Sequence, residues 1–214
     1  MPKTEPFDIY TKEYEEWFVK NKNVYLSEIN LIRHLMENIS SVSEDAIEIG
    51  VGTGLFASKL GIKKGVEPSE KMAEVARNRG IDVVFGVAEN LPLKSGSFSV
   101  ALMVTTICFV DDPELALKEV HRILKKDGCL IIGFVDKNTK LGKFYLKNKE
   151  KSKFYKPATF FSTEEIVDLL KTAGFKIDAI SQTLNGTLSD VKEIQPIEEG
   201  FGKCAFVGIR AIKS

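Results

Sequence analysis

The sequence predicts one α/β domain, in which helices cover both faces of a mostly parallel sheet of seven strands whose last strand is antiparallel. Three observations support this. Short apolar segments alternate with amphipathic ones, the connections are short, and no helix separates the last two apolar segments. Alternation is typical of a parallel sheet, because parallel neighbours need a crossover. A chain of 214 residues suits a single domain with one core.

The expected elements follow from hydrophobic periodicity and from start and stop signals. Strand 98–104 is almost continuously apolar, as expected of a strand that is buried on both faces. The pairs Ser69-Glu70 and Asp112-Pro113 are typical helix starts. The expected strands are 46–49, 65–67, 81–85, 98–104, 129–134, 177–183 and 204–212. The expected helices after the first strand end near Leu60, Arg79, Lys125 and Ala173.

Residues 1–45 precede the first strand and are expected to be helical. Apolar positions between Val24 and Ile39 recur near the 3.6-residue period, and an earlier amphipathic piece carries an aromatic stripe. The stripe consists of Tyr10, Tyr14, Trp17 and Phe18.

Composition and charge narrow the classes of protein and partner. Acidic and basic residues balance at 30 each, so no global field favours nucleic acid or a membrane surface. No apolar run reaches the roughly 18–20 residues that span a bilayer. The three cysteines, Cys108, Cys129 and Cys204, have no metal-ligand spacing and indicate a reducing compartment. We therefore expect a cytoplasmic protein without a bound metal, and the sequence carries no signal for an oligomeric state.

The sharpest motif is a glycine-rich loop, Glu48-Ile-Gly-Val-Gly-Thr-Gly54, between the first strand and the following helix. Glycines allow a tight turn and let a ligand lie against the backbone. The dinucleotide fingerprint GxGxxG would need a third glycine where this chain has Leu55, which argues against a nicotinamide or flavin cofactor. A loop of this kind by itself also fits an ordinary strand-to-helix turn.

Glu67 is expected at the end of the second strand, beside the glycine loop. A carboxylate there can accept hydrogen bonds from both ribose hydroxyls of an adenosine at the switch point of the sheet. The alternative is an acid that is favoured by the dipole at the start of the next helix. Together with the glycine loop, the ribose role is the preferred interpretation.

These motifs together resemble those of the class I S-adenosylmethionine (SAM)-dependent methyltransferases of the methyltransferase type 11 group, with a Rossmann-like fold. Further matching pieces are Val66-Glu-Pro-Ser69, Gly86-Val-Ala-Glu-Asn-Leu-Pro-Leu93 and Leu124-Lys-Lys-Asp-Gly128. The resemblance covers about residues 46–134. It implies that SAM is the cofactor, and that 1–45 is a helical lid, 46–134 the cofactor-binding core, 135–158 a lysine-rich insert and 159–214 a C-terminal helix with a strand hairpin.

The resemblance also implies roles for individual residues. The glycines would cradle the methionine part of the cofactor, Glu67 would hold the ribose, and the backbone at Thr105 would face the methionine amino group. Val87 stands where the family usually has an aspartate, so a contact to the adenine is lost or taken over by Glu89. The expected cofactor-binding residues are Glu48, Gly50, Gly52, Gly54, Glu67, Pro68, Met72, Ala88, Glu89 and Thr105.

The acceptor side carries no evident general base. Many relatives have a histidine pair after the fourth strand, where this chain has Cys108-Phe109, and the chain's two histidines, His34 and His121, lie elsewhere. The aromatic stripe either closes over the cofactor as a lid or packs on the core. The candidate acceptor-pocket residues are Tyr10, Tyr14, Trp17, Thr106, Cys108 and Phe109.

Three functions remain open from the sequence. The preferred one is methyl transfer to a small-molecule acceptor by direct in-line displacement. The second is an RNA methyltransferase, because lysines and aromatics that alternate can bind single strands. The stretch that could do so holds Lys137, Lys140, Lys143, Lys147, Lys149, Lys151, Lys153 and Lys156. The third is a non-catalytic, cofactor-binding subunit of a partner enzyme.

Overall fold

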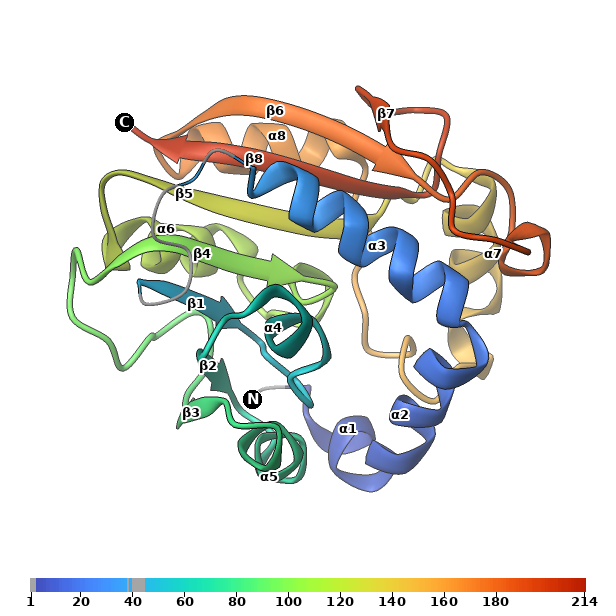
Figure 1. The fold of residues 1–214 in the computed structure, drawn as a ribbon, viewed down its shortest axis with the longest axis horizontal. Coiled ribbons are helices and arrows are strands. Elements are labelled where there is room, and N and C mark those ends of the chain that lie inside the picture. Colours follow the sequence, from blue (N-terminus) through green and yellow to red (C-terminus); the bar gives the residue numbers. More distant parts are fainter. Residues whose placement is uncertain (1–2, 38, 40–44) are drawn as a thin grey trace.

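A computed structural model describes residues 3–37, 39 and 45–214 (Figure 1). The strands are β1 (Ala46–Ile49), β2 (Lys64–Glu67), β3 (Asp82–Phe85), β4 (Phe98–Val104), β5 (Leu124–Val135), β6 (Phe175–Thr183), β7 (Glu198–Glu199) and β8 (Phe206–Lys213). The α-helices are α1 (Glu5–Ile9), α2 (Thr11–Lys20), α3 (Lys22–Leu35), α4 (Leu55–Leu60), α5 (Glu70–Asn78), α6 (Pro113–Ile123), α7 (Lys140–Asn148) and α8 (Thr163–Thr172). Short 3₁₀ turns cover Ile107–Phe109, Lys149–Lys151 and Leu188–Asp190.

The sheet has the order β3-β2-β1-β4-β5-β8-β6-β7 within the described part of the chain. Strands β1 to β5 pair in parallel, and β8 lies antiparallel between β5 and β6. The expected mostly parallel sheet with an antiparallel last strand is therefore confirmed. The additional strand, β7, consists of two glutamates that pair with the edge of β6. Because it contains no apolar residue, hydrophobic periodicity could not predict it. Strands β2 and β3 lie on one side of β1, whereas β4 and β5 lie on the other side. Open α/β sheets bind ligands at the point where the strand order changes in this way, here between β1 and β4.

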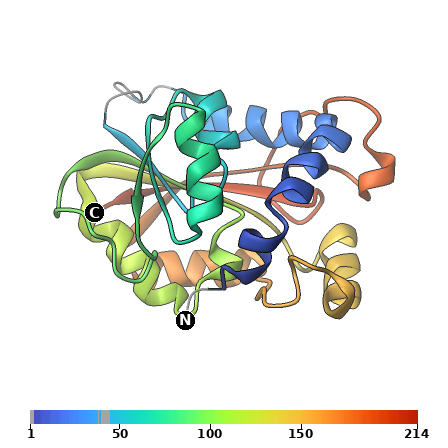
Figure 2. The same ribbon diagram turned by 90° about the horizontal axis from the view of Figure 1, so that it is seen from below.

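Helices cover both faces of the sheet. Helices α3, α4 and α5 contribute to one buried apolar cluster, and α6 and α8 contribute to a second cluster on the opposite face (Figures 1 and 2). None of the helices in the described ranges is long and apolar enough to cross a membrane. The last part of the N-terminal segment that we expected to be helical, residues 38 and 40–44, lies outside the described residues.

Capping side chains start the helices where the sequence predicts. The Ser69 hydroxyl accepts from the backbone N–H of Met72, and Ser162 forms a reciprocal capping box with Glu165. Helix α6 ends at Ile123 instead of near Lys125, because the chain enters β5 directly. Strand β5 begins well before the expected residue 129, and its pairing with β4 contains a bulge next to Phe98.

The lysine-rich insert is partly helical, which the sequence analysis did not predict. Thr139 caps α7 by accepting from the backbone N–H of Gly142, and Leu141 and Gly142 are buried. The helix is only nine residues long, and three of its residues are lysines.

Helix α3 lies against the sheet at two glycines that face each other in the β5–β8 register, Gly133 and Gly208. A Cβ atom at Gly208 would lie 2.3 Å from Leu31 Cδ2 and 2.6 Å from Leu35 Cδ1. Both leucines are at most 2% exposed, so neither has room to move aside. Glycine at these positions allows the close approach of α3 to the sheet.

We predict that Gly208→Ala lowers the free energy of unfolding by about 1–3 kcal/mol through overpacking. Leu31→Ala by itself should cost about 2–5 kcal/mol. The double variant should lose less than the sum of the two, because the smaller side chain at 31 makes room for the new methyl group. Urea denaturation of the four proteins measures this, and strict additivity would contradict the close contact.

Candidate active site

The glycine loop after β1 has the backbone conformation that its composition predicts. Gly50, Gly52 and Gly54 have φ angles of 69°, 55° and 78°, in the left-handed region that favours glycine. The N–H groups of Gly50 and Val51 donate to the carbonyl of Val66 at 2.8 and 3.0 Å. These bonds hold the loop against the end of β2.

Glu67 ends β2 and connects the loop with the start of α5. Its Oε2 accepts the backbone N–H of Gly52 at 2.8 Å, and its Oε1 accepts that of Ser69 at 2.9 Å. Burial raises the pKa of the Glu67 carboxyl to about 7, although these two hydrogen bonds act in the opposite direction. The carboxyl is 7% exposed and borders a cavity, so part of its accepting capacity is free for a ligand.

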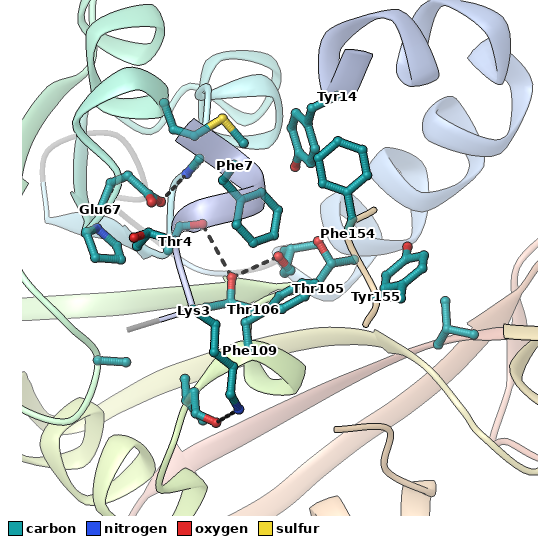
Figure 3. A pocket seen from close by; sticks show the side chains of 18 of the residues that line it. Lys3, Thr4, Phe7, Tyr14, Glu67, Thr105, Thr106, Phe109, Phe154 and Tyr155 are labelled. Carbon is teal, nitrogen blue, oxygen red and sulfur yellow. Dashed lines mark hydrogen bonds between the residues drawn. The ribbon is translucent and has the colours of Figure 1, made fainter. Parts of the chain in front are cut away.

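The cavity has a volume of about 190 Å³ and lies beside the glycine loop. Of the expected residues, it is lined by Gly50, Gly52, Glu67, Pro68, Met72, Ala88, Glu89 and Thr105 on the cofactor side and by Tyr14, Trp17, Thr106 and Phe109 on the acceptor side. In Figure 3, Tyr14 and Phe109 lie with Phe7 and Phe154, while Glu67 lies across the pocket. Residues from the N-terminal helices, the cofactor-binding core and the lysine-rich insert therefore meet here.

Four of the expected site residues do not line this cavity. Glu48 is buried in β1 with an unpaired Oε2, and burial raises its pKa to about 8. Gly54 faces Ile81 and Ala76 at the start of α4. Both positions are buried behind the lining of the cavity, and their expected role in cofactor binding stays a prediction.

Tyr10 and Cys108 also lie outside the main cavity. The ring of Tyr10 is under the Lys153 ammonium, 4.3 Å from its centroid, and Cys108 borders a separate cavity of about 20 Å³. Burial raises the pKa of the Cys108 thiol to about 12, which opposes the formation of a thiolate. The two histidines are also outside: His34 pairs with Glu37 at 3.3 Å, and His121 packs against Phe175.

The turn after β4 is strained next to the cavity. Thr105 has φ = 53°, which a β-branched residue rarely adopts and which costs about 1–3 kcal/mol. Its neighbour Thr106 donates to the carbonyls of Gly50 and Val104 at 3.3 and 3.1 Å. The turn is therefore held against the glycine loop, and backbone groups of both segments border the same cavity.

The N-terminal helices are fastened across the cofactor side by polar contacts. The Lys3 ammonium donates to the Val110 carbonyl at 3.1 Å (Figure 3), and the Ser69 hydroxyl donates to Asp8 at 2.6 Å. The Glu15 carboxylate accepts from the Thr53 hydroxyl and forms an ion pair with Arg79. We refer to the contacts among Glu15, Thr53 and Arg79 as the Glu15 clamp.

Sequence reasoning missed several residues that line the acceptor side. Phe7, Tyr145, Phe154 and Tyr155 surround it together with the expected aromatics, and Glu28 of α3 contributes a carboxyl. Phe154 and Tyr155 belong to the lysine-rich insert. The high lysine content of the insert indicated a charged surface, so the sequence did not show that these two rings line the cavity. A signal for Glu28 did exist, because it lies one helical turn after Val24 and one before Ile32 on the apolar face of α3.

Glu89, which we expect to take over the contact of the aspartate missing at Val87, has a structural role that the sequence did not indicate. Val87 lines the cavity, as does Glu89. However, Oε1 of Glu89 accepts the backbone N–H groups of Asp111 at 2.6 Å and Asp112 at 3.3 Å. Glu89 therefore holds the segment after β4 in place as well as bordering the cavity.

Comparison with known proteins identifies the family. The chain matches the family described as "Methyltransferase domain" over residues 47–132. A solved structure from Thermotoga maritima, described as a SAM-dependent methyltransferase and possible histamine N-methyltransferase, is 55% identical with a TM-score of 0.93, covering 98% of this chain and 99% of that one. An uncharacterized protein of Methanocaldococcus jannaschii is 40% identical over 208 residues, which cover 97% of this chain and 98% of that protein.

A relative with a named reaction is the ubiquinone/menaquinone biosynthesis C-methyltransferase of Campylobacter jejuni, 35% identical over 164 residues that cover 65% of this chain and 69% of that enzyme. The family resemblance drawn from the motifs, and the expectation of SAM as cofactor, are thereby confirmed. The glycine cradle and the buried Glu67 acceptor fit such a cofactor chemically. The chain is a member of the SAM-dependent methyltransferase family and a methyltransferase that uses SAM.

Proposed function

We propose that this methyltransferase transfers a methyl group to a small-molecule acceptor inside the cavity, under the N-terminal helices. The observation that carries the proposal is the aromatic lining of the cavity directly beside the glycine loop. We call these side chains the aromatic wall: Phe7, Tyr14, Trp17, Phe109, Tyr145, Phe154 and Tyr155. An enclosed apolar cavity with few polar groups is typical of small-molecule sites.

On the cofactor side, Gly50 and Gly52 would give the methionine part close access to the backbone, and Glu67 would accept hydrogen bonds from the ribose. Pro68, Met72 and Ala88 line the same side and would contact the adenine. Glu48 would act indirectly, by holding the strand beneath the loop. SAM supplies a sulfonium-bound methyl group that is already electrophilic, so the chain mainly has to align the acceptor.

The acceptor would lie among the aromatic wall, whose rings pack against one another. Phe7 meets Phe109 edge to face at 4.9 Å between ring centroids, and Tyr145 lies 4.9 Å from Tyr155. Rings packed this way keep a fixed shape. A fixed wall holds the acceptor near the strained Thr105 turn and supplies the proximity that an in-line displacement needs.

The RNA alternative is disfavoured by what the lysine-rich insert contacts. Lys137 pairs with Glu165 at 2.6 Å, and Lys153 pairs with Glu13 at 3.6 Å. The aromatics Tyr145, Phe154 and Tyr155 line the cavity, so their rings are not free to stack on nucleobases. Only Phe144 among the insert's aromatics is largely exposed. A non-catalytic role is disfavoured because the cavity extends from the glycine loop to the aromatic wall, where an acceptor could lie beside the cofactor.

The names of the relatives do not agree on the acceptor atom. The Thermotoga protein is described with a nitrogen acceptor and the Campylobacter enzyme with a carbon acceptor. The acceptor of this chain therefore has to be inferred from its own residues.

The proposed function predicts where a labelled methyl group will go. When the protein is incubated with methyl-labelled SAM and a cell extract, the label should appear in the dialysable, nuclease-resistant fraction. A boiled protein provides the control. Label that stays with RNA and is released by nuclease would support the RNA alternative and contradict this proposal.

We predict that Glu67→Ala weakens SAM binding by about 2–4 kcal/mol, because hydrogen bonds to a charged acceptor contribute about 1.5–3 kcal/mol each. Calorimetric titration measures the affinity, and circular dichroism confirms that the variant is folded. Glu70→Ala is a matched control, since Glu70 is exposed and pairs only with Arg77. Equal losses of SAM affinity in the two variants would contradict a ribose contact at Glu67.

We predict that Glu15→Gln speeds release of the demethylated cofactor by about three- to tenfold, because it weakens the partly buried Glu15 clamp that holds α2 to the loop. Stopped-flow displacement of the bound product measures the rate. Glu16→Gln is the control, because Glu16 lies on the same helix and has only an exposed pairing with Lys12. An unchanged rate in Glu15→Gln would mean that the N-terminal helices do not act as a lid.

A further inference from the structure

Glu28 is a buried carboxyl group that faces the acceptor side of the cavity. Its side chain belongs to α3 and is 5% exposed, and Val24, one helical turn earlier, lines the same cavity. No hydrogen bond or ion pair from the described residues satisfies the Glu28 carboxyl. Buried acids in proteins normally have such a partner, so its absence here needs an explanation.

The groups around Glu28 are aromatic and uncharged. The titratable side chains that interact with its charge are Tyr14 of α2, Tyr25 of α3, Tyr145 of α7 and Tyr155 of the following segment. Burial raises the pKa of each of these phenols above its usual value, so all four stay neutral near pH 7. The Tyr25 hydroxyl donates to the Leu55 carbonyl at 2.6 Å and is therefore engaged elsewhere.

Burial raises the pKa of Glu28 to about 8, and no cation within the described residues lowers it. Without a cationic partner, Glu28 is therefore a neutral carboxylic acid at pH 7, since an ionised carboxylate without a partner is strongly disfavoured in apolar surroundings. A cation that enters the cavity would supply the missing partner. Tyr14, Trp17 and Tyr155 line the same cavity, and aromatic rings can attract such a charge through cation–π contacts.

We propose that Glu28 is the recognition group for the methyl acceptor, and that the acceptor is a compact organic molecule carrying an ammonium group. This proposal rests on the proposed function and specifies its substrate class. The ammonium group binds at Glu28, while the aromatic wall contacts the rest of the molecule. A neutral or anionic molecule of the same shape leaves the Glu28 acid without a charge partner and binds more weakly.

Proton release accompanies binding. The free site is mostly protonated at pH 7, whereas the carboxylate–ammonium pair carries no proton on Glu28. With a pKa of about 8 in the free site, binding of the cation releases about 0.9 proton per site at pH 7. A carboxylic acid that only fills space would stay protonated and release none.

Calorimetry on protein saturated with the demethylated cofactor tests the proposal, and saturation also keeps Glu67 occupied. The probes are benzylammonium and phenethylammonium, each with its alcohol and carboxylate counterpart of matched shape. Wild type should bind an ammonium probe at least about tenfold more tightly than the alcohol, which corresponds to about 1.4 kcal/mol. Titrations in buffers of different ionisation enthalpy should show the release of nearly one proton.

Glu28→Gln keeps the shape of the side chain and should remove both the preference for ammonium and the proton release. Glu37→Gln is the matched control, because Glu37 follows the same helix and is exposed. The folded pKa of Glu28 lies above its unfolded value, so its stabilising effect is complete at low pH and disappears as the pH rises through about 8. Glu28→Gln should therefore lose less stability than wild type between about pH 5 and 8, which also verifies that it folds.

Two results would overturn the proposal. One is an alcohol or carboxylate probe that binds as tightly as its ammonium counterpart, or the absence of binding by either ammonium probe. The other is a Glu28→Gln variant that keeps the ammonium preference and the proton release. Neither result touches the proposed function, which is decided separately by the fate of the labelled methyl group.

Discussion

The carboxylate of Glu67 is the contact on which the cofactor half of the structure depends. It accepts one backbone N–H from the glycine loop and another from the residue that caps α5. The capping residue, Ser69, also donates to Asp8 of α1. One acid at the end of β2, one strand away from the sheet's switch point, thus connects the loop, the following helix and the N-terminal segment, and all three border the cavity.

The cofactor half could be predicted because its signals are local in the sequence. The glycines at 50 and 52 sit in a turn whose backbone angles require them, and Glu67 follows at the end of the next strand. Parallel pairing of β1 with β2 then brings the two together without further information. Glu48 was assigned to this half from the motif, but its strand position turns its carboxyl into the core.

The acceptor half could not be predicted to the same degree, because it forms through contacts between distant segments. Phe7, Tyr145 and Phe154 meet only after α1 and the lysine-rich insert fold over the same end of the sheet. The lysine-rich composition of the insert indicated a charged surface and gave no sign that its aromatic rings line the cavity. Tyr10 and Cys108 were sensible candidates by sequence neighbourhood, yet each lies just beyond the cavity wall.

The glycine pair that seats α3 on the sheet has a consequence for how this enzyme can diverge. Val24 and Glu28, which lie one helical turn apart on α3, line the cavity. Leu31 and Leu35, farther along the same helix, pack against Gly208. Because the contact leaves no slack, α3 cannot shift to reshape the cavity without loss of stability. On the proposal that Glu28 recognises the acceptor, new acceptor preferences are expected to arise by exchange of side chains at positions such as 24 and 28, on an α3 backbone that stays fixed.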